Sequence, residues 1–395
     1  MTPRDPAISP VVVACCRTAI GRSHPARGVF REVRGDDLAA AVVAAVVDRS
    51  GVDPATVEDV ILGCTQQRGE LGTNVARSVA LMADLPLAAA GTTVNRLCGS
   101  SLQALAQACH AIAAGAENVQ IVGGVEHMHH LPMDSDVDVH PRVFARSSRG
   151  MLSMGLTAEH LAATHGIGRR RQEEYALESH ARAAHAADAG LFDDEIVRVT
   201  GHDESGTVLE AAFDQSIRRD TSLEAMAALE PAFLPGIGTV TAATSAPVSD
   251  GAAAMLVMSA AEAARQGLEP LARVVATAVV GVPPAVMGTG PVAATRKLLA
   301  RVAGRGIAAG DIGLVELNEA FAAQAIHCRD ALGLDAARVN VRGGSLAIGH
   351  PLGASGARIA TTLLHAMRDE GVHLGLATMC IGMGQGIAVL FERCD

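Results

Sequence analysis

The sequence predicts a layered α/β protein that consists of two similar halves, with an insertion in the first. Short apolar runs typical of strands alternate with helical runs near the start of the chain, and the same texture returns from Asp250 to the end. Between these regions, residues 126–245 are more polar and hold most of the histidines. With 395 residues, 49% of them hydrophobic, the chain can bury a large core and divide into two or three domains.

The first half alternates strands and helices in a regular order. Strands are expected at VVVACC (11–16), VEDVILGC (57–64) and NVQIVGGVE (118–126). Helices are expected at Asp37–Asp48 and Ser101–Ala114, where apolar residues recur every three or four positions. This alternation is typical of a sheet covered by helices.

The second half repeats the pattern of the first. The expected strand LVEL (314–317) leads to a glycine-rich turn and a helix of small residues (340–367), and then to the strand LGLATMC (374–380). In the first half a turn, a helix of small residues and an apolar strand follow in the same order. We infer a duplicated unit, and a pseudo-twofold arrangement would bring the two special turns together near the centre.

The polar middle segment is expected to carry one long charged helix at Arg169–Ala189, followed by a loop at GHDESG (201–206). Three arginines begin this helix, but Glu173 and Glu174 follow at once. This pattern is typical of a solvated helix start rather than of a binding patch.

Composition and charge exclude several classes of function. The net charge of −10, with no Trp and one Tyr, argues against a nucleic-acid partner. The first ten residues contain no apolar signal core, and Leu38–Val47 is too short to span a bilayer, so we expect a cytoplasmic protein without a membrane segment. Eight cysteines without CxxC spacing predict thiols, most of them buried as small apolar residues.

Cys98 is the first candidate for chemistry. It stands just before the expected helix at Ser101, where unpaired N–H groups and the helix dipole favour an anion, so we expect a lowered thiol pKa. Gly99 would let a substrate carbonyl approach the backbone closely. Cys109, on the apolar face of the same helix, is expected to be inert core.

The second half offers partners for Cys98. His350 follows a dense run of glycines and precedes a helix, which favours a neutral ring able to accept a proton. Cys380 ends an apolar strand, and the glycines after it leave N–H groups available for an oxyanion. Asn318 follows the strand LVEL, where its amide could hold an oxygen atom or simply cap the next helix.

The run Glu126-His127-Met128-His129-His130 raises the question of a metal site. Neither cysteines nor further carboxylates stand at ligand spacing, and histidines in loops are commonly solvated. We therefore expect no metal site here.

The motifs taken together resemble the thiolases, most closely the 3-ketoacyl-CoA thiolases that form the β-subunit of bacterial fatty-acid oxidation complexes. The resemblance rests on NRLCGSSLQAL, GGVEHM, TSAPVSDGAAA, NEAFAAQ, NVRGGSLAIGHPLGASGARI and CIGMGQGIA, and it extends from RTAIGR to CIGMGQGIAVLFER. It implies a five-layer α/β/α/β/α fold of two halves. The corresponding domains would be residues 1–121 completed by 246–267, an inserted loop domain at 122–245, and residues 268–395.

The resemblance also implies roles for individual residues. Cys98 would be the nucleophile that becomes acylated, His350 would activate it, and Cys380 would exchange a proton with C2 of acetyl-CoA or with the CoA thiol. The N–H groups of Cys98 and Gly382 would bind the thioester oxygen, while His350 and a water held by Asn318 would bind the enolate. Residues expected to contact CoA or the acyl chain are Arg218, Ser245, Met154, Phe233 and Phe321.

The implied reaction is the cleavage of 3-ketoacyl-CoA by CoA in fatty-acid β-oxidation. Coenzyme A would be a substrate and no cofactor would be bound permanently. A homodimer or homotetramer is expected, with a fatty-acid oxidation α-subunit as a further candidate partner. The segments GGVEHMHHLPMD and MCIGMGQG favour this degradative activity over the alternative, a biosynthetic acetoacetyl-CoA thiolase.

Two features depart from the family pattern, and two other functions fit the sequence less well. Ala246 replaces a usual serine in the CoA-binding turn beside the unusual Pro247, and Glu230 stands at a usually basic position, so CoA affinity is expected to differ. A decarboxylating condensing enzyme would pair its cysteine with two histidines, which Cys380 and NEAF disfavour. A noncatalytic acyl-CoA-binding partner is disfavoured because all four catalytic positions are present.

Overall fold

The computed structural model describes residues 6–394, and most of its strands form one hydrogen-bonded order, β11-β12-β13-β10-β1-β9-β5-β3-β4. Two short strands pair beside this path, β2 with β9 and β6 with β1, and β7 and β8 form a separate hairpin. The strands are β1 (Pro10–Thr18), β2 (Gly21–Arg22), β3 (Asp59–Gly63), β4 (Ala90–Val94), β5 (Val119–His127), β6 (Ile196–Val197), β7 (Val199–His202), β8 (Val208–Ala211), β9 (Ser249–Ser259), β10 (Ala272–Gly281), β11 (Leu314–Leu317), β12 (Leu374–Ile381) and β13 (Gln385–Arg393).

The pairing pattern repeats between the two halves. In the first half β1 and β9 are antiparallel, β9 and β5 are antiparallel, and β5 and β3 are parallel. In the second half β10, β13, β12 and β11 pair in the same sequence of directions. The halves join where β1 pairs with β10, through Val11 opposite Arg273 and Val12 opposite Ala272. This repetition supports the inferred duplication.

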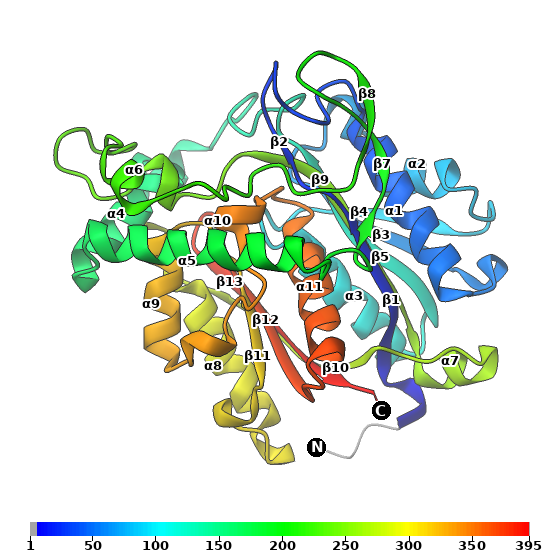
Figure 1. Cartoon of the computed structure of the whole chain (residues 1–395). Coiled ribbons are helices and arrows are strands. Elements are labelled where there is room, and N and C mark those ends of the chain that lie inside the picture. Colours follow the sequence, from blue (N-terminus) through cyan, green and yellow to red (C-terminus); the bar gives the residue numbers. More distant parts are fainter. Residues whose placement is uncertain (1–5, 395) are drawn as a thin grey trace.

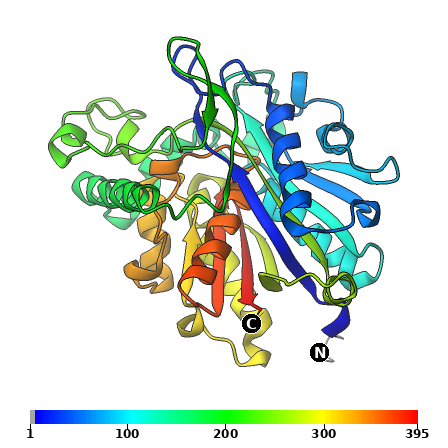
Figure 2. The same ribbon diagram turned by 45° about the vertical axis from the view of Figure 1, so that its right-hand side comes forward.

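The helices complete five layers, as Figures 1 and 2 show. Helices α1 and α2 cover the outer face of the first sheet region, α3 and α11 pack against each other between the two, and α8 and α9 lie on the second. The expected fold class is therefore confirmed. The helices are α1 (Gly35–Ser50), α2 (Val75–Met82), α3 (Ser100–Ala114), α4 (Met154–His165), α5 (Arg169–Asp188), α6 (Leu223–Ala227), α7 (Ala260–Gln266), α8 (Gly290–Val302), α9 (Ala322–Leu332), α10 (Ser345–Ile348) and α11 (Ser355–Asp369).

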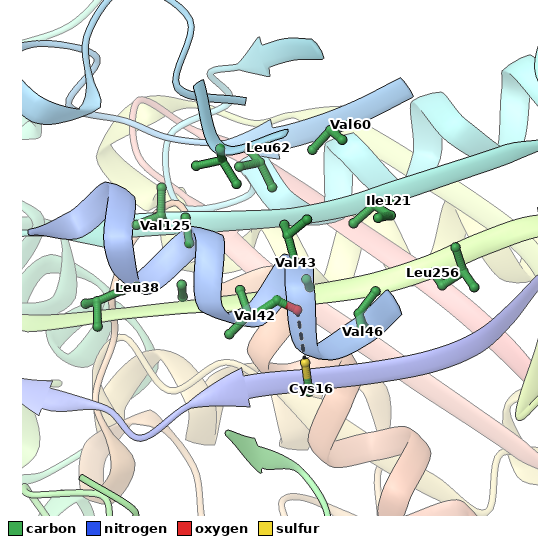
Figure 3. Packing of buried hydrophobic residues seen from close by; sticks show 14 of the residues in the cluster. Cys16, Leu38, Val42, Val43, Val46, Val60, Leu62, Ile121, Val125 and Leu256 are labelled. Atoms are coloured by element: carbon green, nitrogen blue, oxygen red, sulfur yellow. Dashed lines mark hydrogen bonds between the residues drawn. The ribbon is translucent and has the colours of Figure 1, made fainter. Parts of the chain in front are cut away.

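The outer core shows why these sequences form these layers. Leu38, Val42 and Val46 recur on one face of α1 and pack on strands whose residues are buried on both faces, which explains the continuous apolar runs of those strands (Figure 3). Cys16 lies in the same cluster, and its Sγ donates to the Val42 carbonyl oxygen at 3.4 Å. Burial raises the pKa of this thiol to about 12, so it behaves as an apolar core residue.

Most expected elements lie within a few residues of their observed bounds, and two differ. GHDESG was expected as a loop, but Gly201 and His202 belong to β7, and the hairpin turn follows them. His127 was placed in a loop region, but it is the last residue of β5, buried in the sheet opposite Asp250. Pairing extends both segments, which are too polar to be read as strands: His127 pairs with the distant strand β9, and Gly201 and His202 pair with the neighbouring strand β8.

The segment between β5 and β9 contains α4, α5, α6 and the β7–β8 hairpin, and Figure 1 shows α4, α5 and α6 beside α9 and α10. At the start of α5, Arg169 and Arg170 pair with Glu173 and Glu174, and Arg171 pairs with Asp330. The exposed Arg170 and Arg171 agree with the expected solvated helix start. Arg169 does not, because its partner Glu173 is buried and its Nη2 donates to the carbonyl oxygens of Met226, Ala227 and Leu229. No helix within residues 6–394 has the length and the apolar run that crossing a bilayer requires.

Candidate active site

Cys98 lies in a tight turn directly before α3, whose N-cap is Gly99, as the sequence predicts. The preceding Leu97 adopts φ 46°, a left-handed conformation that is unusual for a leucine. A side chain at Gly99 would collide with the side chain of Ile381, so the close approach that this glycine permits is that of β12 and not of a substrate. Cys98 itself remains partly exposed. The turn therefore exposes part of the Cys98 residue while its sulphur is largely desolvated.

The electrostatics of Cys98 differ from the sequence-based expectation. Burial of the sulphur raises the thiol pKa to about 11, and the N–H groups of Gly382 and of Cys98 itself only partly oppose this effect. The expected lowering of this pKa is wrong, because desolvation outweighs the N–H groups that favour the thiolate. At neutral pH Cys98 is therefore a thiol, and it would need a base in order to act as the expected nucleophile. The two N–H groups that reach the sulphur are the pair expected to bind the thioester oxygen.

His350 lies in the turn between α10 and α11 and is buried. Its Nδ1 lies 2.6 Å from Ser355 Oγ, and that hydroxyl donates its hydrogen to the Pro351 carbonyl oxygen at 2.8 Å. The hydroxyl therefore accepts from Nδ1–H, which leaves the Nε2 lone pair unprotonated. Burial, followed by the nearby Arg358 charge, lowers the pKa of His350 to about 3. The expected neutral base is thus supported, although burial is the main cause.

The backbone of the His350 turn is fixed as firmly as the ring. The His350 N–H donates to Ser249 Oγ at 3.1 Å, and the Gly353 N–H donates to the buried carboxylate of Glu126 at 2.8 Å. Gly349 adopts φ 123°, which other residues rarely adopt. Glu126 also accepts from the N–H groups of Thr65 and Gln66, so it ties this turn to the first half of the molecule.

Asn318 follows β11 directly and is fully buried. It does not cap α9, whose N-cap is Phe321, so the structural alternative for this residue is wrong. Its Nδ2 lies 3.5 Å from His350 Nε2, and its Oδ1 accepts from Ser345 Oγ at 2.6 Å. The amide therefore presents its N–H groups toward the base.

Cys380 is buried near the end of β12, two residues from Thr378, whose carbonyl oxygen accepts from the Asn318 N–H at 3.0 Å. Burial and the proximity of Cys98 raise the pKa of the Cys380 thiol well above its usual range. A thiol held in its protonated form can act as an acid. Arg96 Nη1 donates to Gln385 Oε1 at 3.0 Å and links the Cys98 turn to the turn that follows Gly382.

Three of the five residues expected to contact the substrate lie together. Met154, Phe233 and Phe321 pack with Cys380, Ala158, Val240 and Met287 in one apolar cluster. The rings of Phe233 and Phe321 meet edge to face, with centroids 6.0 Å apart. An acyl chain beside Cys380 would meet an apolar wall.

The other two expected contacts lie elsewhere. Arg218 is exposed, and its backbone N–H donates to His180 Nδ1 at 3.2 Å. The Ser245 hydroxyl donates to the Thr241 carbonyl oxygen at 2.8 Å, while the Ala246 N–H donates to the Ala320 carbonyl oxygen at 3.0 Å. The turn that carries Ala246 in place of the family's usual serine is thus held against the NEAF motif, which begins at Asn318.

The histidines after Glu126 are not the solvated loop residues that the sequence suggested. His130 Nδ1 lies 3.0 Å from Glu70 Oε1 and its Nε2 lies 2.8 Å from the Arg31 carbonyl oxygen, while His127 Nε2 lies 3.1 Å from the Phe30 carbonyl oxygen. Glu70, His127 and His130 lie close enough to hold a metal ion in principle. Their ring nitrogens, however, already have protein partners, and the prediction of no metal site stands as a prediction.

Ser345, Ser355 and Glu126 lie among the expected site residues but are not themselves expected there from the sequence. Ser345 and Ser355 stand in the glycine-rich motif of His350, and a hydroxyl within such a turn is the one signal that pointed to them. Glu126 attracted attention only as part of a metal motif, whereas its carboxylate in fact orients backbone N–H groups.

The chain is similar to known proteins over nearly its whole length. Residues 10–261 match the model of the thiolase N-terminal domain, and residues 268–393 match that of the thiolase C-terminal domain. A 3-ketoacyl-CoA thiolase of Pseudoalteromonas translucida is 50% identical, with 98% of this chain and 99% of that protein covered. A 3-ketoacyl-CoA thiolase of Aeromonas salmonicida is 51% identical, with 97% and 99% covered.

Solved structures give the same result. Human mitochondrial 3-ketoacyl-CoA thiolase superimposes with a TM-score of 0.90 at 34% identity and covers 98% of this chain and 100% of its own. The Bacillus anthracis acetyl-CoA acetyltransferase has a TM-score of 0.88 at 37% identity, with 98% and 99% covered. The chain, including the turns that carry Cys98 and His350, therefore belongs to the thiolase family.

Proposed function

We propose that this protein is a 3-ketoacyl-CoA thiolase, an acyltransferase that cleaves 3-ketoacyl-CoA with CoA to acetyl-CoA and a shortened acyl-CoA in fatty-acid β-oxidation. The observation that carries this proposal is that the neutral His350 ring faces the Asn318 amide, while the helix after His350 is bonded to the helix after Cys98 through Ala357 N–H and Ser101 Oγ at 2.8 Å. His350 Nε2 lies 3.5 Å from Asn318 Nδ2, and the Gly382 N–H reaches the Cys98 sulphur. The relatives at about half identity bear the same activity in their names.

In the first half-reaction, His350 Nε2 accepts the proton of the Cys98 thiol while Sγ adds to C3 of the substrate. The C2–C3 bond then breaks, and its electron pair passes to the enolate of acetyl-CoA. The protonated His350 and a water held by Asn318 stabilise the enolate oxygen, and Cys380 donates its thiol proton to C2. The acyl group remains on Cys98 as a thioester.

In the second half-reaction, the Cys380 thiolate takes the proton of the incoming CoA thiol, and the CoA sulphur attacks the acyl carbonyl carbon. The N–H groups of Cys98 and Gly382 stabilise the negative oxygen, each contributing on the order of 3 kcal/mol. Cys98 leaves as a thiolate and regains its proton from His350. Coenzyme A is thus a substrate, and both thiols return to their starting state.

The cleavage test uses short and long 3-ketoacyl-CoA with CoA, beside a Cys98→Ala control. We expect loss of the long substrate, formation of acetyl-CoA, and a mass increase of one acyl group on Cys98 when CoA is withheld. Cleavage confined to acetoacetyl-CoA would support the alternative biosynthetic activity, which the name of the B. anthracis neighbour suggests. Failure to cleave any 3-ketoacyl-CoA would refute the proposal.

The CoA-binding residues are proposed on their positions. Met154, Phe233 and Phe321 would contact the acyl chain or pantetheine, because they line the cluster at Cys380. Arg218, as an exposed cation, would contact the nucleotide, and Ser245 would lie beside pantetheine in the turn against Ala320. Ala246 and Glu230 are expected to raise the KM for CoA relative to a chain with serine and a basic residue there.

We also propose a cytoplasmic homodimer or homotetramer. Strand β4 ends the sheet order, and Leu81, Met82 and Leu87 are exposed beside it. Light scattering of the purified protein tests this oligomeric state.

An α-subunit of a fatty-acid oxidation complex is a further proposed partner, to be tested by co-purification. The net charge of −10 disfavours a nucleic-acid partner.

The proposed domains remain residues 1–121 with 246–267, residues 122–245 and residues 268–395. Residues 1–5 and 395 lie outside the described part of the chain. The first boundary falls within β5 (Val119–His127). Limited proteolysis, with cleavage expected between β5 and β9, tests the division.

A further inference from the structure

Asn318 owes its orientation to a buried hydroxyl outside the expected catalytic set. Ser345 Oγ lies 2.6 Å from Asn318 Oδ1, and Arg358 Nη2 donates to the same Oγ at 2.8 Å. A guanidinium group can only donate, so Ser345 accepts from Arg358 and directs its single hydrogen to Asn318. The atom of Asn318 that faces Ser345 is therefore the oxygen, and its NH₂ group must face His350.

The same direction of donation continues through the base. Asn318 Nδ2 faces His350 Nε2, His350 Nδ1–H donates to Ser355 Oγ, and Ser355 donates to the Pro351 carbonyl oxygen. A cation that only donates stands at one end of this chain, and a carbonyl that only accepts stands at the other. The two ends leave one consistent assignment for the amide and for the ring tautomer.

Arg358 is poorly compensated for a buried cation. Its side chain is fully buried on α11, and its nearest carboxylate is Glu316, with 3.7 Å between Nη1 and Oε2. Within residues 6–394, Nε and Nη1 of Arg358 have no hydrogen-bond partner. Such a group generally reduces stability compared with an apolar side chain of similar size. A purely structural role explains its presence poorly, whereas its bond to Ser345 places it in the chain that ends at His350.

We propose that Ser345 and Arg358 are positioning residues that hold the Asn318 amide with its N–H groups toward the enolate oxygen. This proposal rests on the thiolase activity proposed above. Without the Ser345 hydroxyl, the amide can rotate by 180° and present its oxygen to the developing negative charge. The loss would fall on formation of the enolate and not on binding of CoA.

A double-mutant cycle of Ser345→Ala and Asn318→Ala tests the proposal, with single-turnover measurements at excess enzyme to follow slow variants. In the presence of Asn318, Ser345→Ala is expected to lower the rate of C2–C3 cleavage about 10- to 100-fold, with the KM for 3-ketoacyl-CoA changed less than about twofold. In the Asn318→Ala background, the same substitution is expected to change the rate less than about twofold. Ser345→Cys, with a weaker donor of similar shape, is expected to fall between serine and alanine.

Thr362→Val is the matched control. Like Ser345, which begins α10, Thr362 on α11 carries a buried hydroxyl. This hydroxyl donates to Glu195 Oε1 at 3.1 Å and not to Asn318. This variant is expected to keep the cleavage rate within about twofold while losing as much thermal stability as Ser345→Ala.

Three outcomes would overturn the inference. They are a wild-type rate for Ser345→Ala, an equal loss in both backgrounds of the cycle, and an equal loss for Thr362→Val. Each requires wild-type protein that cleaves 3-ketoacyl-CoA, whereas failure of the wild type would refute the proposed function itself. The two failures are thus distinguishable.

Discussion

The turns that carry Cys98 and His350 hold their side chains in opposite ways. Cys98 is partly exposed, follows a left-handed Leu97, and is linked to the other half by Arg96 and Gln385. His350 is buried, and its ring and backbone both have hydrogen-bond partners, among them Ser355 and Ser249. The nucleophile must reach a substrate, so its turn stays accessible. The base must keep one tautomer, so its turn is enclosed.

The largest expected effect separates activity from stability at the accessible turn. Cys98→Ala removes the nucleophile, and we expect thiolysis to fall by at least about 10⁴-fold. Because Cys98 is only partly buried, the unfolding midpoint is expected to change little. Steady-state rates and thermal melts of the same preparation check both parts. A large loss of stability would mean that this turn is as enclosed as the turn of His350.

The next effect tests whether the enclosed turn fixes a tautomer. Ser355→Ala removes the acceptor for His350 Nδ1–H, so the ring can adopt the tautomer that protonates Nε2. We expect kcat for cleavage to fall about 100-fold with a small change in KM. A parallel fall in thermal stability no larger than that of Thr362→Val would assign the loss to the ring. An unchanged kcat would show that the tautomer is fixed by another contact.

The two turns are also expected to respond to pH with opposite sign. The folded pKa of His350, about 3, lies below its ordinary value of 6.5, so its contribution to stability is present above pH 6.5 and is lost as the pH falls toward 3. At pH 5 the loss is about 2 kcal/mol. The folded pKa of Cys98 is raised from 9.0 to about 11, so its contribution is present below pH 9 and is lost as the pH rises toward 11.

Denaturant titrations at pH 5, 7 and 10 measure this difference. Comparison with His350→Gln and Cys98→Ala isolates the two residues from the other buried histidines and thiols. We expect the glutamine variant to lose less stability than the wild type between pH 7 and pH 5. An equal loss in both proteins would show that His350 takes up no proton in this range.

The smallest effect concerns backbone strain in the accessible turn. Leu97→Gly removes an unfavourable left-handed leucine but also removes its apolar contacts and adds chain entropy to the unfolded state. These contributions oppose each other, and we expect the free energy of unfolding to change by less than about 1 kcal/mol. Cleavage is expected to slow about tenfold, because the Cys98 sulphur would be held less firmly. A stabilising change above 2 kcal/mol would show that the strain dominates.

The sequence predicts the helices and strands of this molecule better than it predicts the pKa values of the side chains they carry. The helix start after Cys98 and the strands before Asn318 and Cys380 follow from local periodicity. The pKa of Cys98 does not, because desolvation depends on what the fold packs around the sulphur. The pKa of Cys98 is therefore raised, and not lowered as its position before a helix suggests.

The partners of the catalytic side chains were equally hidden from sequence. Ser345 and Asn318 are 27 positions apart and meet only because α10 packs beside the end of β11. His127 joins a strand because β9, far along the chain, pairs with it. The motif resemblance implied the roles of these residues, whereas only the arrangement in space shows which groups orient them.

The repeated strand order of the two halves has an evolutionary consequence. One half supplies the cysteine and the other supplies the histidine, so neither repeat alone contains a complete site. A shorter ancestor with one such unit could assemble the reaction centre only by self-association, with both side chains present in every copy. Fusion into a single chain lets each copy keep one duty and mutate the other away, which ties the inheritance of the two halves together.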